Sequence, residues 1–216
     1  MNALHLRRAA VAVSAAALLP LALTACSSDD SKDSAAASGS RPGTASAPAA
    51  PKGGSPDKDQ PFGPGCASVP KDGAGSFAGM AKDPVATAAS NNPDLTTLVA
   101  AVGQAGLADT LNNARSITVF APTDDAFAKI PKADLDKLLA DKAALTEVLT
   151  YHVVGQRLTP EQLEKGTFDT LAKSTLTASG SGVTYTVNDS SKVVCGGVPT
   201  ANATVYLVDT VLMPPM

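Results

Sequence analysis

Side chains suited to acid–base or metal chemistry are few in this sequence of 216 residues. Its only histidines are His5 and His152, whereas most hydrolase triads and most zinc sites need a well-placed histidine. Asp124 and Asp125 form an acidic pair of the kind that binds metal ions or moves protons. Neither has a histidine or a second acidic cluster nearby, so we interpret the pair as negative charge at a helix N-terminus. The sequence predicts no catalytic residue, no metal site and no cofactor.

Tyr151 and His152 are the second pair with functional side chains. His152 shares a helical face with Leu145, Val148 and Leu149, and this spacing favours a position in the core. In that interpretation Tyr151 covers a sheet edge and His152 forms a hydrogen bond beside a strand. A buried, neutral histidine would also make stability fall in acid. The alternative is that both side chains contact a binding partner.

The overall composition limits the classes of partner. The formal net charge is −3 at pH 7 and no cluster of Lys and Arg is present, which argues against nucleic acid as a partner. With no Trp, three Tyr and five Phe, the core must consist mostly of Val, Leu and Ala. The Gly196–Gly197 pair lacks the following helix that a phosphate-binding loop needs.

The first 25 residues have the pattern of a secretory signal peptide. Arg7 and Arg8 precede an apolar segment at residues 9–19, which is too short to be a stable membrane span. Cys26 follows a small residue, with Leu23 three positions before it, as in the bacterial lipobox. We therefore predict a lipoprotein signal peptide at residues 1–25 and a lipid on Cys26 that attaches the chain to a membrane. An ordinary signal peptide with an incidental cysteine is the alternative.

A polar segment separates this signal from the folded part. Residues 27–65 contain no Leu, Ile, Val or Met, so they cannot bury enough apolar area to offset the entropy of ordering. We predict a disordered tether at residues 26–65 and a folded domain at residues 66–216. A tail without a mechanical role is the alternative interpretation of the segment.

The first half of the folded part has helical patterns around one strand. Residues 85–90 are rich in alanine, and the Leu and Val residues in 95–102 recur at helical spacing. Residues 117–121 form an apolar run that indicates a buried strand, and Pro122 must end it because proline cannot donate to a sheet. The hydroxyl of Thr123 is then expected to cap the helix that follows.

Beyond residue 155 the pattern changes to period two. Strand-like segments occur at residues 167–171, 174–178, 183–187 and 192–195. Residues 204–208 are apolar on both faces, which is typical of an interior strand. Helices followed by an antiparallel sheet predict an α+β fold without internal repeats.

Three stretches of the sequence resemble the marks of a fasciclin (FAS1) domain, namely residues 118–127, the Tyr151–His152 pair within residues 149–154, and residues 202–214. Shorter strings are similar to the secreted and lipid-anchored fasciclin antigens of mycobacteria, at residues 63–66, 90–96, 194–198 and 200–204. The resemblance implies a FAS1 fold, which is a wedge-like sandwich of two β-sheets flanked by several α-helices. It also implies an extracellular domain associated with adhesion, in which the Tyr–His pair is often linked with partner binding, and it implies no known catalytic residues.

Cys66 and Cys195 are the cysteines that remain beside Cys26. In an exported chain two such cysteines suggest one disulfide, and the related antigens have a cysteine at both matching positions, which implies the same bridge. Such a bridge would disfavour the unfolded chain by about 4–5 kcal/mol in the chain-entropy model. Two free buried thiols are the alternative.

Together these features predict a bacterial, non-catalytic fasciclin-domain protein on the extracellular face of the cell membrane, lipid-anchored through Cys26, or else secreted. We expect it to mediate adhesion, by binding an extracellular or envelope protein or a glycan. A carrier of small apolar ligands is the alternative, and an apolar cavity of roughly several hundred Å³ between the sheet and the helices would favour it. An envelope enzyme is less favoured, because the mature chain has one histidine and no paired carboxylate motif.

Overall fold

The computed structural model describes residues 60–215. The predicted signal peptide, Cys26 and most of the predicted tether lie outside these residues. The helices of the described part are η1 (Pro64–Ala67), α1 (Phe77–Met80), α2 (Val85–Ser90), η2 (Pro93–Leu95), α3 (Thr96–Ala105), α4 (Ala108–Asn113), α5 (Asp124–Ala128), α6 (Lys132–Ala140), α7 (Lys142–Tyr151) and α8 (Pro160–Leu163). The strands are β1 (Ile117–Pro122), β2 (Val153–Val154), β3 (Lys165–Asp169), β4 (Thr175–Ser181), β5 (Thr184–Val187), β6 (Ser191–Pro199) and β7 (Ala203–Val208).

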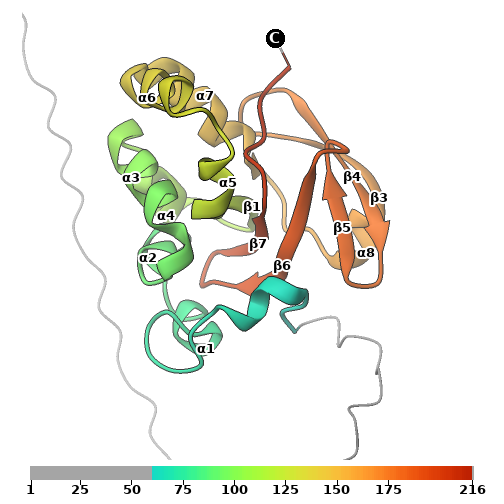
Figure 1. The fold of residues 1–216 in the computed structure, drawn as a ribbon. Coiled ribbons are helices and arrows are strands. Elements are labelled where there is room, and N and C mark those ends of the chain that lie inside the picture. Colours follow the sequence, from blue (N-terminus) through green and yellow to red (C-terminus); the bar gives the residue numbers. More distant parts are fainter. Residues whose placement is uncertain (1–59, 216) are drawn as a thin grey trace, which may run out of the picture. The chain divides into compact units, whose positions relative to one another are not determined.

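The seven strands follow one another in the order β2-β1-β7-β6-β5-β4-β3. All neighbours pair antiparallel except β1 and β7, which run parallel over their whole length. The sheet is therefore mixed, because a strand from the helical first half of the chain joins the strands of the second half (Figure 1). β7 lies between β1 and β6, which confirms the prediction of an interior strand.

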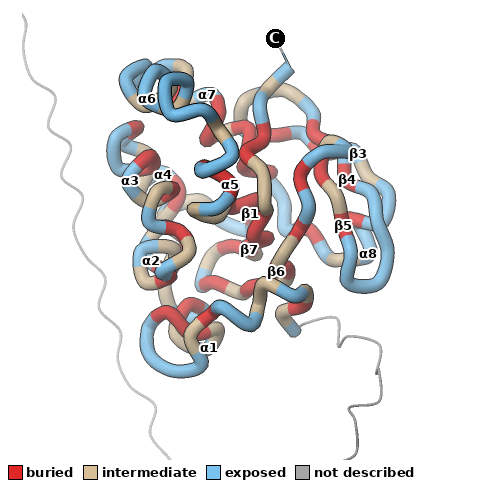
Figure 2. The backbone as a smooth tube through the Cα atoms, viewed as in Figure 1, coloured by how far each residue is buried: buried red, intermediate tan, exposed pale blue. Residues whose placement is uncertain are grey.

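Two hydrophobic clusters lie on either side of β1 and β7. The first cluster joins the sheet to the helices α2 to α7, which gather on one side of these strands (Figure 1). The second cluster lies between the β2-β1-β7 half of the sheet and the β5-β4-β3 half, with β6 shared by both. An isolated β-bridge joins Val154 in β2 to Thr170, which follows β3, so the first and last strands of this order also meet. Figure 2 shows the buried backbone concentrated where these layers meet. The structure thus confirms the α+β fold.

The turn from β1 into α5 departs from the sequence prediction in one detail. All six residues of β1 are buried, and α5 begins two residues after Pro122 ends the strand. The Thr123 hydroxyl makes no capping bond with α5, so the predicted cap is wrong. The backbone N–H of Thr123 donates to the carbonyl oxygen of Val208 at 3.1 Å. Its hydroxyl lies 3.5 Å from the same carbonyl oxygen, so the residue is held against β7.

The start of the folded domain is also earlier than predicted. Phe62 pairs with Gly196 in β6 through two backbone hydrogen bonds of 3.0 and 2.8 Å. Its side chain is 6% exposed and its ring packs against the edges of Tyr185 and Tyr206. The predicted tether boundary at residue 65 is therefore wrong, since residues 62–65 already lie against β6.

Cys66 and Cys195 form the predicted disulfide, with 4.8 Å between their Cα atoms. The bond connects η1 at the start of the domain to β6 and spans a sequence separation of 129 residues. It closes nearly the whole described chain into one loop, which disfavours the unfolded state.

Candidate functional site

Tyr151 is the last residue of α7 and is 2% exposed. Its hydroxyl donates to the carbonyl oxygen of Thr175 at 2.9 Å and accepts from Nδ2 of Asn188 at 2.7 Å. Because Thr175 begins β4 and Asn188 follows β5, the tyrosine ties the end of α7 to the far half of the sheet. Its side chain belongs to the second hydrophobic cluster.

His152 follows directly and connects three parts of the fold. Its Nδ1 lies 2.8 Å from the carbonyl oxygen of Val148, and its Nε2 accepts from the backbone N–H of Leu212 at 2.9 Å. Its own carbonyl oxygen accepts from the backbone N–H of Phe120 in β1 at 2.9 Å. The ring therefore carries its proton on Nδ1 and is neutral. Burial lowers its pKa to about 4, although the bond to Val148 acts in the opposite direction.

The predicted contact role of Tyr151 and His152 requires accessible side chains, but both are only 2% exposed. The structure places both side chains in the core. Tyr151 belongs to the second hydrophobic cluster, whereas His152 lies among residues of the first, such as Leu98 and Leu149. A contribution of the pair to partner binding stays a prediction.

Asp124 and Asp125 both lie in the first turn of α5, as the sequence indicated. Asp124 also acts on the N-terminus of a second helix, α3. The Asp124 carboxylate accepts from the Thr96 hydroxyl at 2.6 Å and from the Thr97 backbone N–H at 2.8 Å. It thereby caps α3, whose own N-cap residue is Leu95 and supplies no side-chain bond. Burial acts to raise the pKa of Asp124, but the hydrogen bonds from Thr96 and Thr97 outweigh it and leave the pKa below its ordinary value. No group of three or more His, Cys, Asp or Glu side chains that could hold a metal occurs in the described part of the chain.

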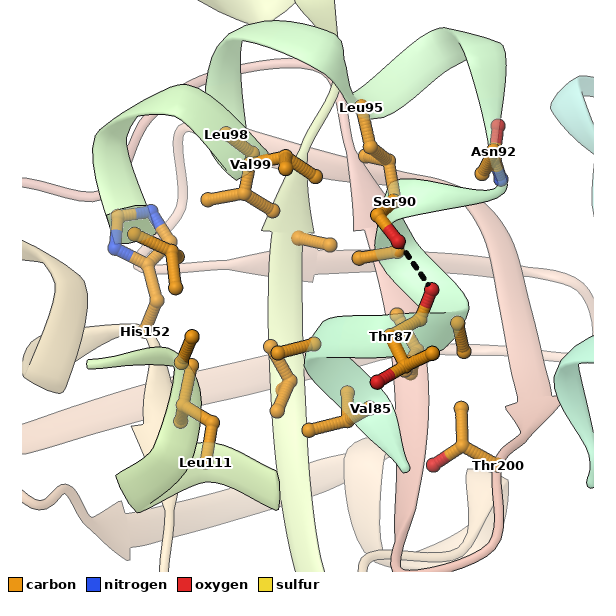
Figure 3. A pocket seen from close by; sticks show the side chains of 18 of the residues that line it. Val85, Thr87, Ser90, Asn92, Leu95, Leu98, Val99, Leu111, His152 and Thr200 are labelled. Atoms are coloured by element: carbon orange, nitrogen blue, oxygen red, sulfur yellow. Dashed lines mark hydrogen bonds between the residues drawn. The ribbon is translucent and has the colours of Figure 1, made fainter. Parts of the chain in front are cut away.

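An apolar pocket of about 300 Å³ lies between the helices and the sheet (Figure 3). Its walls come from α2, α3, α4, β1, β7 and the end of α7. Most of the lining is aliphatic, with side chains such as Leu95, Leu98, Val102 and Leu111. His152 forms part of the wall. Both of its ring nitrogens are already engaged, so it presents no free polar atom to the pocket.

The pocket exists because α2 is built from small side chains. The helix reads Val-Ala-Thr-Ala-Ala-Ser, so only its first residue is a large aliphatic one. Helix backbones pack about 8–10 Å from their neighbours, a spacing set by side chains at the contact. Alanine side chains at this distance from the sheet leave part of the space between the layers empty. Ala88 in this helix is 1% exposed and lines the pocket directly.

Asn92 supplies the unpaired polar group of this pocket. The residue is 2% exposed, and its Oδ1 accepts from the backbone N–H of Asp94 at 2.9 Å. This bond fixes the amide orientation, and Nδ2 then has no hydrogen-bond partner among the described residues. Buried polar groups are nearly always satisfied in native proteins. Nδ2 is itself fully buried, so it is an unsatisfied donor beside the pocket wall and has no contact with the open space of the pocket.

A second hollow is a polar groove on the surface, which we call the arginine groove. It is lined by Asn112, Asn113, Ala114, Arg115, Ser116, Arg157, Ala201 and Asn202. Arg115 and Arg157 are exposed, and neither forms an ion pair or hydrogen bond with the residues that the structure describes. Asn202 holds the groove floor, because its Nδ2 donates to the carbonyl oxygens of Leu111 and Ala114 at 2.8 Å. No acidic residue lines the groove, so it suits anionic groups.

Sequence reasoning identified neither the lining of the apolar pocket nor the arginine groove. The alanine-rich segment 85–90 was the available signal for the pocket, since it predicted a helix too small to fill its share of a core. No comparable signal existed for the groove. Arg115 and Arg157 are separated by 42 positions in the sequence and line one groove only because β1 and the segment after β2 are neighbours.

In the part of the chain that the structure describes, no helix has both the length and the apolar character needed to cross a membrane.

Comparison with known proteins extends over most of the chain. The family model described as "Fasciclin domain" matches residues 93–214. The chain is 49% identical over 161 residues to "Immunogenic protein MPB70" of Mycobacterium bovis, covering 71% of this chain and 82% of the relative. It is 45% identical over 219 residues to "Cell surface glycolipoprotein MPB83" of Mycobacterium bovis (strain BCG / Tokyo 172), covering 95% of this chain and 96% of the relative.

A more distant relative is "Protein sll1483" of Synechocystis, which is 38% identical over 130 residues and aligns with 59% of this chain and 72% of its own length. Among solved structures, the FAS1 domain pair of the insect cell adhesion molecule Fasciclin I matches 56% of this chain and 46% of its own chain. That match has 19% sequence identity and a TM-score of 0.47. On the family match and the two mycobacterial relatives, the chain belongs to the fasciclin domain family.

Proposed function

We propose that this chain is an exported, non-catalytic protein that is acylated at Cys26 and displayed on the outer face of the cell membrane. There its fasciclin domain binds a protein or glycan partner of the envelope or of another cell. Residues 1–25 direct export, and the segment from Cys26 to about residue 59 tethers the domain to the lipid.

The similarity to the mycobacterial glycolipoprotein carries this proposal. That alignment covers 95% of the chain, whereas residues 60–215 are less than three quarters of it. The match therefore extends well into the segment that contains the signal pattern and Cys26. The relative is named a cell surface glycolipoprotein, which agrees with the lipobox-like sequence before Cys26.

The arginine groove supports a binding role and indicates the chemistry of the partner. Two arginines that have no partner among residues 60–215, in an otherwise uncharged groove, would bind carboxylate or sulfate groups through charge-assisted hydrogen bonds. The asparagine side chains beside them are hydrogen-bonded within the protein, so the charge of the groove comes from the two arginines. We therefore favour an acidic glycan, or an acidic protein surface, as the partner.

Lipid attachment is tested with Cys26→Ser in the native host. The unchanged chain should partition with membranes and incorporate a labelled fatty acid, whereas the variant should appear in the medium without label. A variant that stays membrane-bound and labelled would contradict acylation at this position.

The groove is tested with the full Cys26→Ser chain, which needs no detergent, and with immobilised heparin as an acidic polysaccharide probe. Arg115→Ala/Arg157→Ala should weaken binding about tenfold or more, because two charge-assisted contacts are lost. Lys132→Ala/Lys165→Ala removes the same charge at exposed positions outside the groove and should have little effect. Equal losses in both variants would show that net charge, and not the groove, governs binding.

A second function, the carriage of a small apolar ligand, is favoured by one observation. The apolar pocket has a volume of about 300 Å³, which is within the range of small-molecule sites. It lies behind α2 and shares only Asn112 with the lining of the arginine groove. A protein of this kind could perform both functions.

A further inference from the structure

The apolar pocket is much larger than ordinary packing defects. Protein interiors contain few voids larger than a water molecule, whereas this pocket has a volume of about 300 Å³. At roughly 30 Å³ for a water-sized group, it would hold about ten such groups. An unbranched hydrocarbon chain of about ten carbons therefore matches its capacity.

The polar groups of the pocket are distributed unevenly. Figure 3 shows Asn92 and Ser90 toward one end and His152 with Leu111 toward the other. The His152 end offers no free hydrogen-bonding atom of the ring, because both ring nitrogens are hydrogen-bonded within the protein. The Asn92 end holds the unpaired Nδ2 donor. The pocket thus has an apolar end and an end next to one buried, unsatisfied hydrogen-bond donor.

The pocket also has a route to solvent. Thr87, Ser90 and Gly103 line it and are exposed at the surface between α2 and α3. The Ser90 hydroxyl donates to the Thr87 carbonyl oxygen at 2.6 Å and so stays close to α2. A Cβ added to Gly103 would meet no atom within 4 Å, so this part of the opening is free of other side chains.

We infer that the pocket binds one medium-length acyl chain, with about ten carbons, through its carbonyl oxygen and its hydrocarbon tail. A small rotation of the buried Asn92 side chain brings Nδ2 to the carbonyl oxygen of the acid or ester, which accepts its hydrogen bond. The tail lies along Leu98 and Leu111 toward His152, where it replaces empty space with apolar contacts. This inference deepens the second function proposed above by naming its ligand class, and it does not depend on the arginine groove.

The test uses the full Cys26→Ser chain, purified without detergent and stripped of lipid on a hydrophobic resin. Titration calorimetry measures the binding of decanoate and of its glycerol monoester, which share the chain and the carbonyl group but come from different lipid sources. Saturable binding of either ligand with 1:1 stoichiometry supports the inference. Binding of neither at millimolar concentration overturns it.

Matched variants then locate the ligand. Ala88→Leu adds three carbons inside the pocket, and Ala100→Leu adds the same carbons on the exposed side of α3. We expect Ala88→Leu to weaken binding at least tenfold and Ala100→Leu to leave it unchanged. If Ala88→Leu does not fold, Gly103→Leu at the opening provides the same comparison. Binding that survives every folded pocket variant would place the ligand elsewhere and overturn the inference.

Asn92→Asp tests the head-group contact separately. Asp keeps an acceptor for the Asp94 N–H but removes the Nδ2 donor and adds a negative charge. Decanoate binding should fall at least tenfold, whereas decanol, which can donate to the new carboxylate, should retain binding. Equal losses for both ligands would contradict a head-group contact at Asn92. Heparin binding by the same protein reports the arginine groove, so the two proposals fail independently.

Discussion

Lowering the pH from 8 to 5 should destabilise the fold through His152. Burial holds the pKa of this histidine at about 4 in the folded state, against an ordinary value of 6.5. The histidine of the unfolded chain therefore becomes protonated below pH 6.5, whereas in the folded chain it becomes protonated only below about pH 4. The stabilisation is complete above pH 6.5 and is lost progressively as the pH falls toward 4. By linkage the loss is about 2 kcal/mol at pH 5 and about 3 kcal/mol in full.

Thermal and chemical denaturation of the full Cys26→Ser chain at a series of pH values measure this loss directly. A loss of about 2 kcal/mol corresponds to a decrease in Tm of roughly 4–8 °C for a domain of this size. His152→Gln is the matched control, because its amide oxygen can accept from the Leu212 N–H but does not titrate. The variant should be less stable at pH 8 and should have a flat profile down to pH 5. His5 is present in both proteins, so their difference isolates His152.

Two outcomes would refute this reasoning. A Tm that is constant between pH 5 and 8 in the parent chain would mean that His152 is not held neutral. An equal pH dependence in His152→Gln would mean that another group titrates in this window. Asp124 and Asp209 do not supply such a dependence, because their pKa values lie below the ordinary 3.8 and they titrate in stronger acid.

Three further predictions concern stability and are measured by urea unfolding. Cys66→Ser/Cys195→Ser should lower the free energy of unfolding by about 5 kcal/mol, because the bridge closes a loop with a sequence separation of 129; an unchanged midpoint would exclude the bridge in solution. Asp124→Ala should cost about 1–2 kcal/mol because α3 loses its cap, whereas Asp125→Ala at an exposed position should stay within about 0.5 kcal/mol; similar costs would contradict the capping role. Phe62→Ala should lower the free energy of unfolding by about 3–5 kcal/mol. A loss near zero would support the predicted domain boundary at residue 65.

Much of the local structure could be predicted because it depends on neighbours in the sequence. The helix at residues 85–90, the stop of β1 at Pro122 and the interior position of residues 204–208 all follow from residue type and spacing. The disulfide followed from the number of cysteines in an exported chain and from the family resemblance. In each case the deciding interaction is local, or is limited to one possible partner.

The predictions that failed depended on contacts between distant segments. Thr123 was expected to cap its own helix, but backbone pairing with Val208, 85 positions away, holds it against β7. Asp124 caps α3, a helix that ends before β1 begins. Phe62 was assigned to a disordered segment by the composition around it, which gave no indication of the aromatic surface on the sheet that receives its ring.

The sequence by itself determined the α+β class, the family, the helical and strand segments, and the cysteine pair. Only the tertiary structure decided that Tyr151 and His152 are buried, that Arg115 and Arg157 share a groove, and that an apolar pocket with an unpaired Asn92 amide remains behind α2. The physical reason is that periodicity specifies which side of an element is apolar. It does not specify how completely the facing side chains fill the space between two elements, or which distant side chains are brought together at the surface.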